Sequence, residues 1–112
     1  MDCIFCKIVA GEIPAKKVKE DGEVLAFHDI DPRAPTHILV IPKKHLASLA
    51  HAGVSDQALL GRLFLAAGEV AREQGLKNGF RVVVSTGPEG GQTVDHLHLH
   101  ILGGRQMHWP PG

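Results

Sequence analysis

Three histidines alternate with aliphatic residues near the end of the chain, in the segment His96-Leu97-His98-Leu99-His100-Ile101-Leu102. A period of two is typical of a β-strand, so the pattern predicts three imidazoles on one face and aliphatic side chains on the other, against a core. At about 3.3 Å per residue the outer two histidines lie roughly 13 Å apart, too far for one metal ion to bind all three rings. A single histidine on a half-exposed strand is commonplace, but three on one face indicate chemistry.

Histidine is the nucleophile that this sequence offers. It contains no Gly-x-Ser-x-Gly elbow, no cysteine close in sequence to its glycine-rich loop, and no tight carboxylate cluster to hold magnesium. A neutral imidazole attacks phosphorus readily and also leaves readily, so a phosphoryl-histidine intermediate can form and collapse. A second imidazole can protonate a leaving amine or hold phosphate oxygens, and backbone N–H groups can offset the developing charge.

A glycine-rich loop over residues 86–93 leads directly into the histidine segment. It matches neither the Walker nor the dinucleotide-binding spacing. Its glycines either serve the backbone conformation alone or present N–H groups to an anion. Because of its position, an oxyanion held by this loop would lie close to an imidazole nitrogen, and we favour the second interpretation.

The composition sets the class of protein. With 112 residues and 44% apolar content, the chain is expected to form a single domain over residues 1–112, with a core modest enough for a subunit interface to supplement it. Twelve basic and twelve acidic residues balance, without long basic runs, which argues against nucleic acid and for a small polar ligand. No segment has the character of a signal peptide or a membrane span, so we expect a cytoplasmic protein that does not bind membranes.

Hydrophobic periodicity and turn residues predict the elements that must position the histidines. The pattern predicts a short helix over residues 2–10 with Asp2 as its N-cap and Gly11 at its end, an edge strand near residues 17–20, and a hairpin turn at Asp21-Gly22. It then predicts strands over 23–28 and 36–41, the second buried on both faces and central, and a helical turn over 46–50.

The second half of the chain is predicted to hold one long helix. Ser55-Asp56 is a suitable N-cap, and apolar residues recur at helical spacing for about 18 residues, until Gly75. The valine-rich sequence of residues 80–85 then predicts another central strand. The proline-rich tail contains Trp109, which we expect to pack against the protein, a partner subunit being one candidate. Strands in sequence with one inserted helix predict an antiparallel sheet of the α+β class.

The alternating histidine segment resembles the His-φ-His-φ-His-φ-φ motif of the histidine triad (HIT) superfamily, where φ is apolar. The similarity continues through residues 3–8, 27–30 and 34–37 to the tail, residues 103–112, which resembles the Hint branch. This resemblance implies a HIT fold: about five antiparallel strands, one long and one or two short helices, and a sheet extended across a homodimer. It also implies a purine nucleoside phosphoramidase that cleaves a P–N bond through a covalent nucleotidyl-histidine intermediate.

The resemblance also implies roles for individual residues. His98 matches the nucleophile, His100 the residue that contacts phosphate and leaving group, and His37 the histidine that buttresses the nucleophile. Asp29 matches the carboxylate that binds the ribose hydroxyls. The full substrate-binding set implied in this way is Phe5, Ile8, Phe27, His28, Asp29, Ile30, Leu39, Ser85, Gly91, Thr93 and His100. Ser85 stands where Hint proteins commonly have Asn, and Thr93 where they have Ser.

Cys3 and Cys6 raise the question of a metal. In a reducing compartment they predict a metal-ligand or free-thiol pair rather than a disulfide. Many bacterial HIT proteins pair a C-x-x-C with two histidines around a structural zinc, and the matching candidates here are His45 and His96. Four such ligands leave no position open for water, so this zinc would be structural and the chemistry would need no cofactor. The alternative is a pair of small apolar residues in a short helix.

Three other functions remain open on sequence alone. A dinucleoside polyphosphate hydrolase of the same superfamily would use the same nucleophile and release a nucleotide, although the Hint-like tail argues against it. A nucleotide-binding interaction protein would show little turnover. A zinc-dependent structural module would unfold when the metal is removed.

Overall fold

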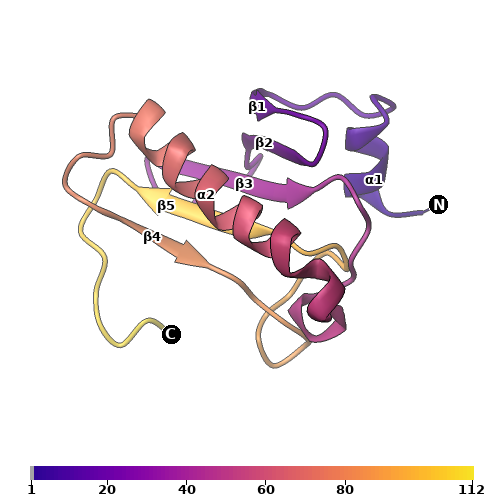
Figure 1. Ribbon diagram of the computed structural model, residues 1–112. Coiled ribbons are helices and arrows are strands. Elements are labelled where there is room, and N and C mark those ends of the chain that lie inside the picture. The colour runs from indigo at the N-terminus through magenta and orange to yellow at the C-terminus, as the bar shows by residue number, and fades with distance from the viewer. Residues whose placement is uncertain (1) are drawn as a thin grey trace.

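A computed structural model describes residues 2–112, which form a five-stranded sheet, two α-helices and two short 3₁₀ turns (Figure 1). The elements, in chain order, are α1 (Ile4–Val9), β1 (Lys17–Glu20), β2 (Val24–His28), β3 (Thr36–Pro42), the 3₁₀ turns Leu49–His51 and Val54–Asp56, α2 (Gln57–Glu73), β4 (Phe80–Val83) and β5 (Leu99–Gly103). Across these described residues, no helix is both long enough and apolar enough to cross a bilayer.

The sheet is entirely antiparallel, with the strand order β1-β2-β3-β5-β4. The α+β class and the number of strands predicted from the sequence are confirmed. β3 is central and buried along almost its whole length, as predicted. The prediction of a central position for β4 is wrong: β5 inserts between β3 and β4, so β4 becomes an edge strand and ends at Val83.

The β1–β2 hairpin forms at the predicted turn. The carboxylate of Asp21 accepts hydrogen bonds from the N–H groups of Glu23 and Val24, at 2.7 and 2.9 Å. This is the backbone-mimicking bond that favours Asp at turns. Arg62 of α2 donates to the other Asp21 oxygen at 2.6 Å, so the turn is also tied to the long helix.

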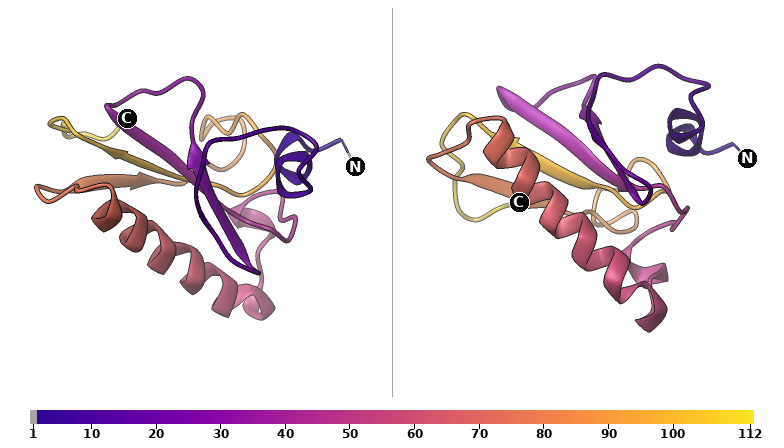
Figure 2. Two further views of the ribbon diagram at one scale, coloured as in Figure 1. Left: turned by 90° about the horizontal axis from the view of Figure 1, so that it is seen from above. Right: turned by 45° about the horizontal axis from the view of Figure 1, so that its top comes forward.

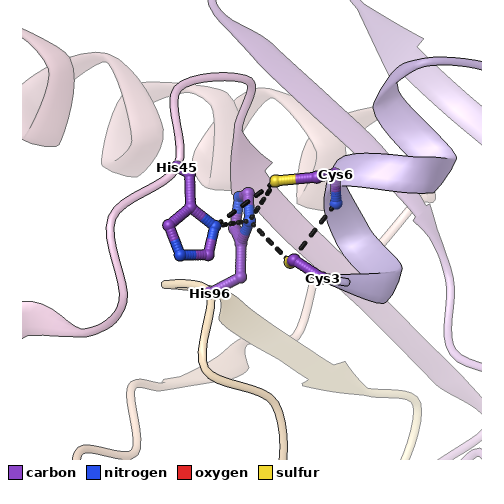
Figure 3. Close-up of side chains that lie close together, drawn as sticks. All are labelled: Cys3, Cys6, His45 and His96. Atoms are coloured by element: carbon purple, nitrogen blue, oxygen red, sulfur yellow. Dashed lines mark hydrogen bonds between the residues drawn. The ribbon is translucent and has the colours of Figure 1, made fainter. Parts of the chain in front are cut away.

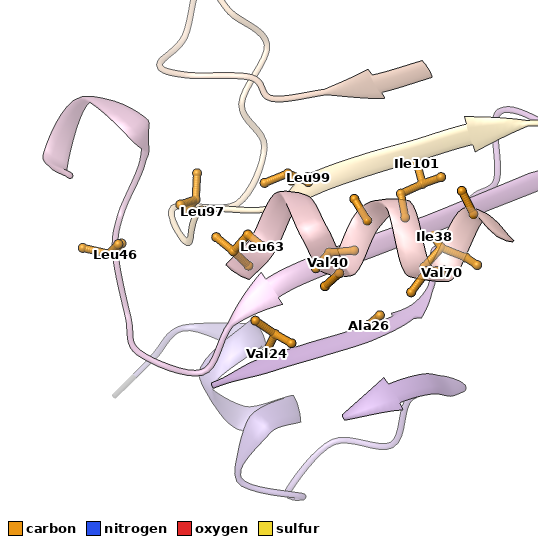
Figure 4. Close-up of a cluster of buried hydrophobic side chains, with 13 residues drawn as sticks. Val24, Ala26, Ile38, Val40, Leu46, Leu63, Val70, Leu97, Leu99 and Ile101 are labelled. Atoms are coloured by element: carbon orange, nitrogen blue, oxygen red, sulfur yellow. The ribbon is translucent and has the colours of Figure 1, made fainter. Parts of the chain in front are cut away.

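Strand alternation divides the interior into two clusters, one on each face of the sheet. Leu99 and Ile101 of β5 face α2, where buried side chains of the sheet and the helix pack together (Figure 4). On the other face a smaller cluster joins β2 and β3 to α1. Figure 2 shows α2 along one side of the sheet and α1 at one end of it. Leu99 and Ile101 therefore lie on the opposite face of β5 from its one histidine, His100, as the sequence predicts.

The histidine segment is regular only in its second half. The β3–β5 ladder begins at Leu99, which pairs with Val40, so His96 and His98 precede the strand rather than belong to it. In this register Leu97 would face Pro42, which has no N–H to donate. The N–H of Leu97 instead donates to the carbonyl of Leu46, at 2.6 Å.

Three smaller expectations need correction. Asp2 is not the N-cap of α1; the cap is Cys3, whose sulfur accepts from the N–H of Cys6 at 3.4 Å. Phe64 is one of the apolar residues at helical spacing that predict α2 and a buried face for it, but its side chain is 53% exposed. Trp109 does not pack within this chain, where it is 83% exposed, and its packing against a partner subunit stays a prediction. Gly11, in contrast, ends α1 as expected, with the positive φ of 80° that favours glycine.

Candidate active site and metal centre

The two central strands bring two of the predicted catalytic histidines together. In the β3–β5 register His37 lies opposite Leu102 and His100 opposite Leu39, so the two histidines are diagonal neighbours on one face. Their rings meet, with Nε2 of His37 and Nδ1 of His100 at 2.9 Å. His98 lies on the same side, its ring centre 4.9 Å from that of His100.

Hydrogen-bond partners fix which nitrogens of this pair carry protons. The main-chain N–H of Arg33 donates to Nδ1 of His37 at 3.0 Å, so that nitrogen is an acceptor. A neutral His37 must then carry its proton on Nε2 and donate it to Nδ1 of His100. By the same reasoning a neutral His100 carries its proton on Nε2. Asp29 completes the group, with Oδ2 at 3.5 Å from Nε2 of His37.

His98 has the opposite tautomer. Its Nδ1 lies 2.6 Å from the main-chain oxygen of His96, which can only accept, so Nδ1 donates. Nε2 of a neutral His98 therefore carries a lone pair. The ring is 4% exposed and packs edge-on against Phe5, with ring centres 5.2 Å apart. The packing and the hydrogen bond together leave this ring little freedom to turn.

Burial keeps the paired histidines neutral near pH 7. The pKa of His100 falls from 6.5 to about 4, mainly because the ring is buried and also because His98 and His37 lie beside it. Burial is also the main reason that the pKa of His37 falls, against the opposing effect of Asp29. Asp29, His37 and His100 offer ligand atoms within 4.8 Å of one another, but the 2.9 Å contact between the two rings is accounted for by one shared proton.

A cavity of about 660 Å³ adjoins the histidine pair through Asp29, although His37, His98 and His100 do not line it. Five of the predicted substrate-binding residues line it: Ile8, Phe27, His28, Asp29 and Ile30. Asp29 thus lies between the cavity and the histidine pair. Phe5 and Leu39 do not line the cavity; they are buried beneath it in the same hydrophobic cluster as Ile8 and Phe27.

The remaining predicted residues lie outside this cavity. Ser85 follows the end of β4, and Gly91 and Thr93 belong to the glycine-rich loop. In that loop Gly91 has a φ of 79°, and a Cβ on Gly90 would lie 2.3 Å from the carbonyl oxygen of Thr86. A second cavity of about 610 Å³, lined by residues 75–81 and 104–107, contains none of the predicted site residues.

Four further predicted ligands converge at the start of α1 (Figure 3). Nδ1 of His96 lies 3.3 Å from the sulfur of Cys3 and 3.6 Å from that of Cys6. Nδ1 of His45 lies 3.3 Å from the sulfur of Cys6 and 3.1 Å from Nδ1 of His96. All four ligand atoms lie within 4.8 Å of one another.

These separations fit a tetrahedral zinc ion. With Zn–S near 2.3 Å and Zn–N near 2.0 Å, tetrahedral geometry places sulfur and nitrogen about 3.5 Å apart and two nitrogens about 3.3 Å apart. Nε2 of His96 donates to the carbonyl of Pro42 at 2.8 Å, so Nδ1 is left as the ligand nitrogen. Burial, together with neighbouring Cys3, raises the pKa of the Cys6 thiol, a penalty that a bound cation offsets.

Several supporting groups were not predicted from the sequence. They are the N–H of Arg33, the carbonyl of Pro42, the side chain of Gln92, and Ile4, Ile13, Pro14, Ala15 and Lys16, which line the cavity beside α1. The first two are main-chain groups, which no side-chain pattern identifies. The run Ile13-Pro14-Ala15 gives a weak signal, because it is apolar yet lies between two elements.

The site therefore combines two features on one antiparallel sheet. One is a histidine pair that adjoins a pocket, and the other is a Cys₂His₂ cluster suited to a metal ion. A family model described as the HIT domain matches residues 10–107. The chain belongs to the HIT domain family.

Known relatives cover nearly the whole chain. An uncharacterized HIT-like protein of Synechococcus elongatus is 56% identical over 111 residues, covering 99% of this chain and 97% of that protein. A 14 kDa zinc-binding protein of Zea mays is 54% identical, covering 97% and 87%. The crystal structure of a HIT family hydrolase from Legionella pneumophila superposes with a TM-score of 0.97 at 52% identity, covering 99% of this chain and all of that one.

Proposed function

We propose that this protein, acting as one HIT domain, is a cytoplasmic hydrolase of purine nucleoside 5′-phosphoramidates. In this proposal His98 attacks the α-phosphorus and carries the nucleotidyl group as a covalent intermediate. The observation that carries the proposal is the 2.6 Å bond from Nδ1 of His98 to the carbonyl of His96. It leaves the Nε2 lone pair of a buried, packed ring as the reactive atom.

The proposed reaction has two steps. In the first, Nε2 of His98 forms a bond to phosphorus as the P–N bond of the substrate breaks, and the leaving nitrogen takes up one proton to depart as an amine. In the second, water attacks phosphorus, the nucleoside monophosphate leaves, and one proton is released. His98 returns as a neutral ring, so the catalyst is unchanged.

His37 and His100 would assist this reaction by supplying an oriented N–H donor. Because Nδ1 of His100 accepts from His37, Nε2–H of His100 is the donor available to a phosphoryl oxygen or to the leaving nitrogen. We assign His37 the role of holding His100 in that tautomer. Both rings stay neutral near pH 7 because burial lowers their pKa values.

The pocket suits a purine nucleoside. Its apolar lining, which includes Ile8 and Phe27, would take the base, and the carboxylate of Asp29 would accept hydrogen bonds from the ribose hydroxyls. Phe5 and Leu39 support the pocket from beneath, His28 and Ile30 form part of its wall, and Ser85, Gly91 and Thr93 would contact the phosphate side.

We further propose that zinc at Cys3, Cys6, His45 and His96 is structural and that the chemistry needs no cofactor. When bound, the ion would cross-link α1, the segment after β3 and the segment before β5. The ligand separations support this role, as does the similarity to the zinc-binding protein of maize. We also propose a homodimer, since edge strand β4 and exposed Trp109 offer unpaired surface.

Two substrates separate this proposal from its alternatives. Adenosine 5′-phosphoramidate and a diadenosine polyphosphate should be compared with wild-type protein and with His98→Ala. We expect faster turnover of the phosphoramidate and its loss in the variant, with nucleotide binding retained. Faster turnover of the diadenosine polyphosphate would support the related hydrolase, and nucleotide binding without turnover of either compound would support an interaction protein.

A further inference from the structure

The side chain of Gln92 makes hydrogen bonds to three main-chain groups around the glycine-rich loop. Its oxygen accepts from the N–H of Gly87 at 3.0 Å. Its nitrogen donates to the carbonyl of Ala47 at 2.7 Å and to that of Val94 at 2.9 Å. An N–H must face the oxygen of the amide and two carbonyls must face its nitrogen, so only one orientation of this amide fits.

These bonds close the loop on itself. The main-chain N–H of Gln92 also donates to the carbonyl of Gly87, at 3.1 Å, so residues 87 and 92 are joined twice. Between them, Gly90 approaches Thr86 too closely for any side chain, and Gly87 and Gly91 have positive φ. A loop with three such glycines has many other conformations when free. The Gln92 amide selects one of them.

The bond to Ala47 connects the loop to the nucleophile. The carbonyl of Leu46, one residue earlier, accepts from the N–H of Leu97, which lies between His96 and His98. One short stretch, residues 46–47, therefore holds the glycine-rich loop through Gln92 and the histidine segment through Leu97. The relative position of loop and nucleophile depends on both bonds.

We propose that Gln92 is a positioning residue that fixes the N–H groups of the glycine-rich loop relative to His98, and so determines how tightly the phosphate of a nucleotide is held. This inference rests on the proposed function, which places phosphate between loop and nucleophile. The amide does not touch the pocket for the base and ribose. Its loss should therefore weaken the binding of a nucleotide and leave that of a nucleoside unchanged.

Gln92→Glu is the sharpest test, because it keeps the size and the acceptor oxygen but removes both donated hydrogen bonds. Gln57→Glu is the matched control: it adds the same charge at an exposed glutamine in the first turn of α2. We expect the dissociation constant of AMP, measured by calorimetry, to rise by about tenfold or more in Gln92→Glu relative to Gln57→Glu, the size expected for two ordinary hydrogen bonds. The dissociation constant of adenosine should change less than about twofold, because the lost hydrogen bonds do not contact the pocket for base and ribose.

Kinetics give a second readout. For the phosphoramidate, KM should rise more than kcat falls, whereas damage to the nucleophile itself would lower kcat. Equal AMP affinity in the two variants would overturn the proposal. An equal loss of AMP and adenosine affinity would also overturn it, because it would mean general loosening of the protein.

Two further results keep the test decisive. If Gln92→Glu does not fold, side-chain amide hydrogen exchange in the wild-type protein replaces it: the NH₂ protons of Gln92 should exchange much more slowly than those of Gln57, and equal rates would overturn the proposal. Wild-type protein that binds no AMP would refute the proposed function and the phosphate role together, whereas AMP binding that is insensitive to Gln92→Glu would refute the role of Gln92 alone.

Discussion

The low pKa of His100 makes the stability of the fold depend on pH in a way that one substitution can isolate. In the unfolded chain this imidazole titrates near 6.5, but in the folded protein burial lowers its pKa to about 4. Between these values the unfolded state binds a proton that the folded state does not. Stability from this residue is therefore complete above about pH 6.5 and is lost as pH falls from there towards 4.

The magnitude follows from the two pKa values. At about pH 5 the unfolded ring is almost fully protonated, whereas about a tenth of the folded rings are. Lowering pH from about 8 to about 5 should then reduce the free energy of unfolding by about 2 kcal/mol through His100 alone. A folded pKa one unit higher would still give about 1.7 kcal/mol.

The assay is urea unfolding of wild-type protein and His100→Gln at both pH values. Glutamine does not titrate, and its side-chain oxygen can still accept from Nε2 of His37. Protonation of the zinc ligands affects both proteins and cancels in the difference. The wild-type protein should lose about 2 kcal/mol more than the variant between about pH 8 and about pH 5. Equal losses, or a larger loss in the variant, would refute the assignment of His100 as a buried imidazole that stays neutral near pH 7.

Three further perturbations test separate parts of the structure. Chelation of a zinc-loaded sample should lower its free energy of unfolding by about 3 kcal/mol when free zinc is about 100 times its dissociation constant, and Cys6→Ser should remove the bound zinc measured by mass spectrometry; full zinc binding by the variant would contradict the site. Gly90→Ala should weaken AMP binding in a calorimetric titration, because its Cβ would collide with Thr86, and unchanged affinity would contradict a defined loop. Leu63→Ala, at a fully buried position of α2, should cost about 3 kcal/mol in urea unfolding, and a cost below about 1 kcal/mol would mean that the core is loosely packed.

The pattern of side chains along the sequence predicted which residues face the core and where the first hairpin turns. The alternation of imidazole and leucine indicated correctly that Leu99 and Ile101 face the core, and Asp21-Gly22 identified its turn. The strand order could not be obtained in this way, because local pattern carries no information on which strand inserts beside β3. For this reason the apolar sequence of β4 predicted a central position, whereas the strand lies at the edge of the sheet.

The candidate site was predictable in its reactive groups and not in the groups that orient them. The four thiol and imidazole side chains named from the sequence meet in the fold, and Asp29 lines the pocket, while its contact with ribose stays a prediction. The hydrogen bonds that set the histidine tautomers come from main-chain groups of Arg33 and His96. Such groups are present at every residue, so only the folded chain can show which of them are used.

The most direct test of the account is to trap its covalent intermediate. Wild-type protein mixed briefly with adenosine 5′-phosphoramidate, quenched and digested, should yield a peptide in which AMP is attached to His98, as located by tandem mass spectrometry. The adduct should be absent from His98→Ala. Turnover without any adduct at His98, or an adduct on another residue, would contradict the assignment of His98 as the nucleophile.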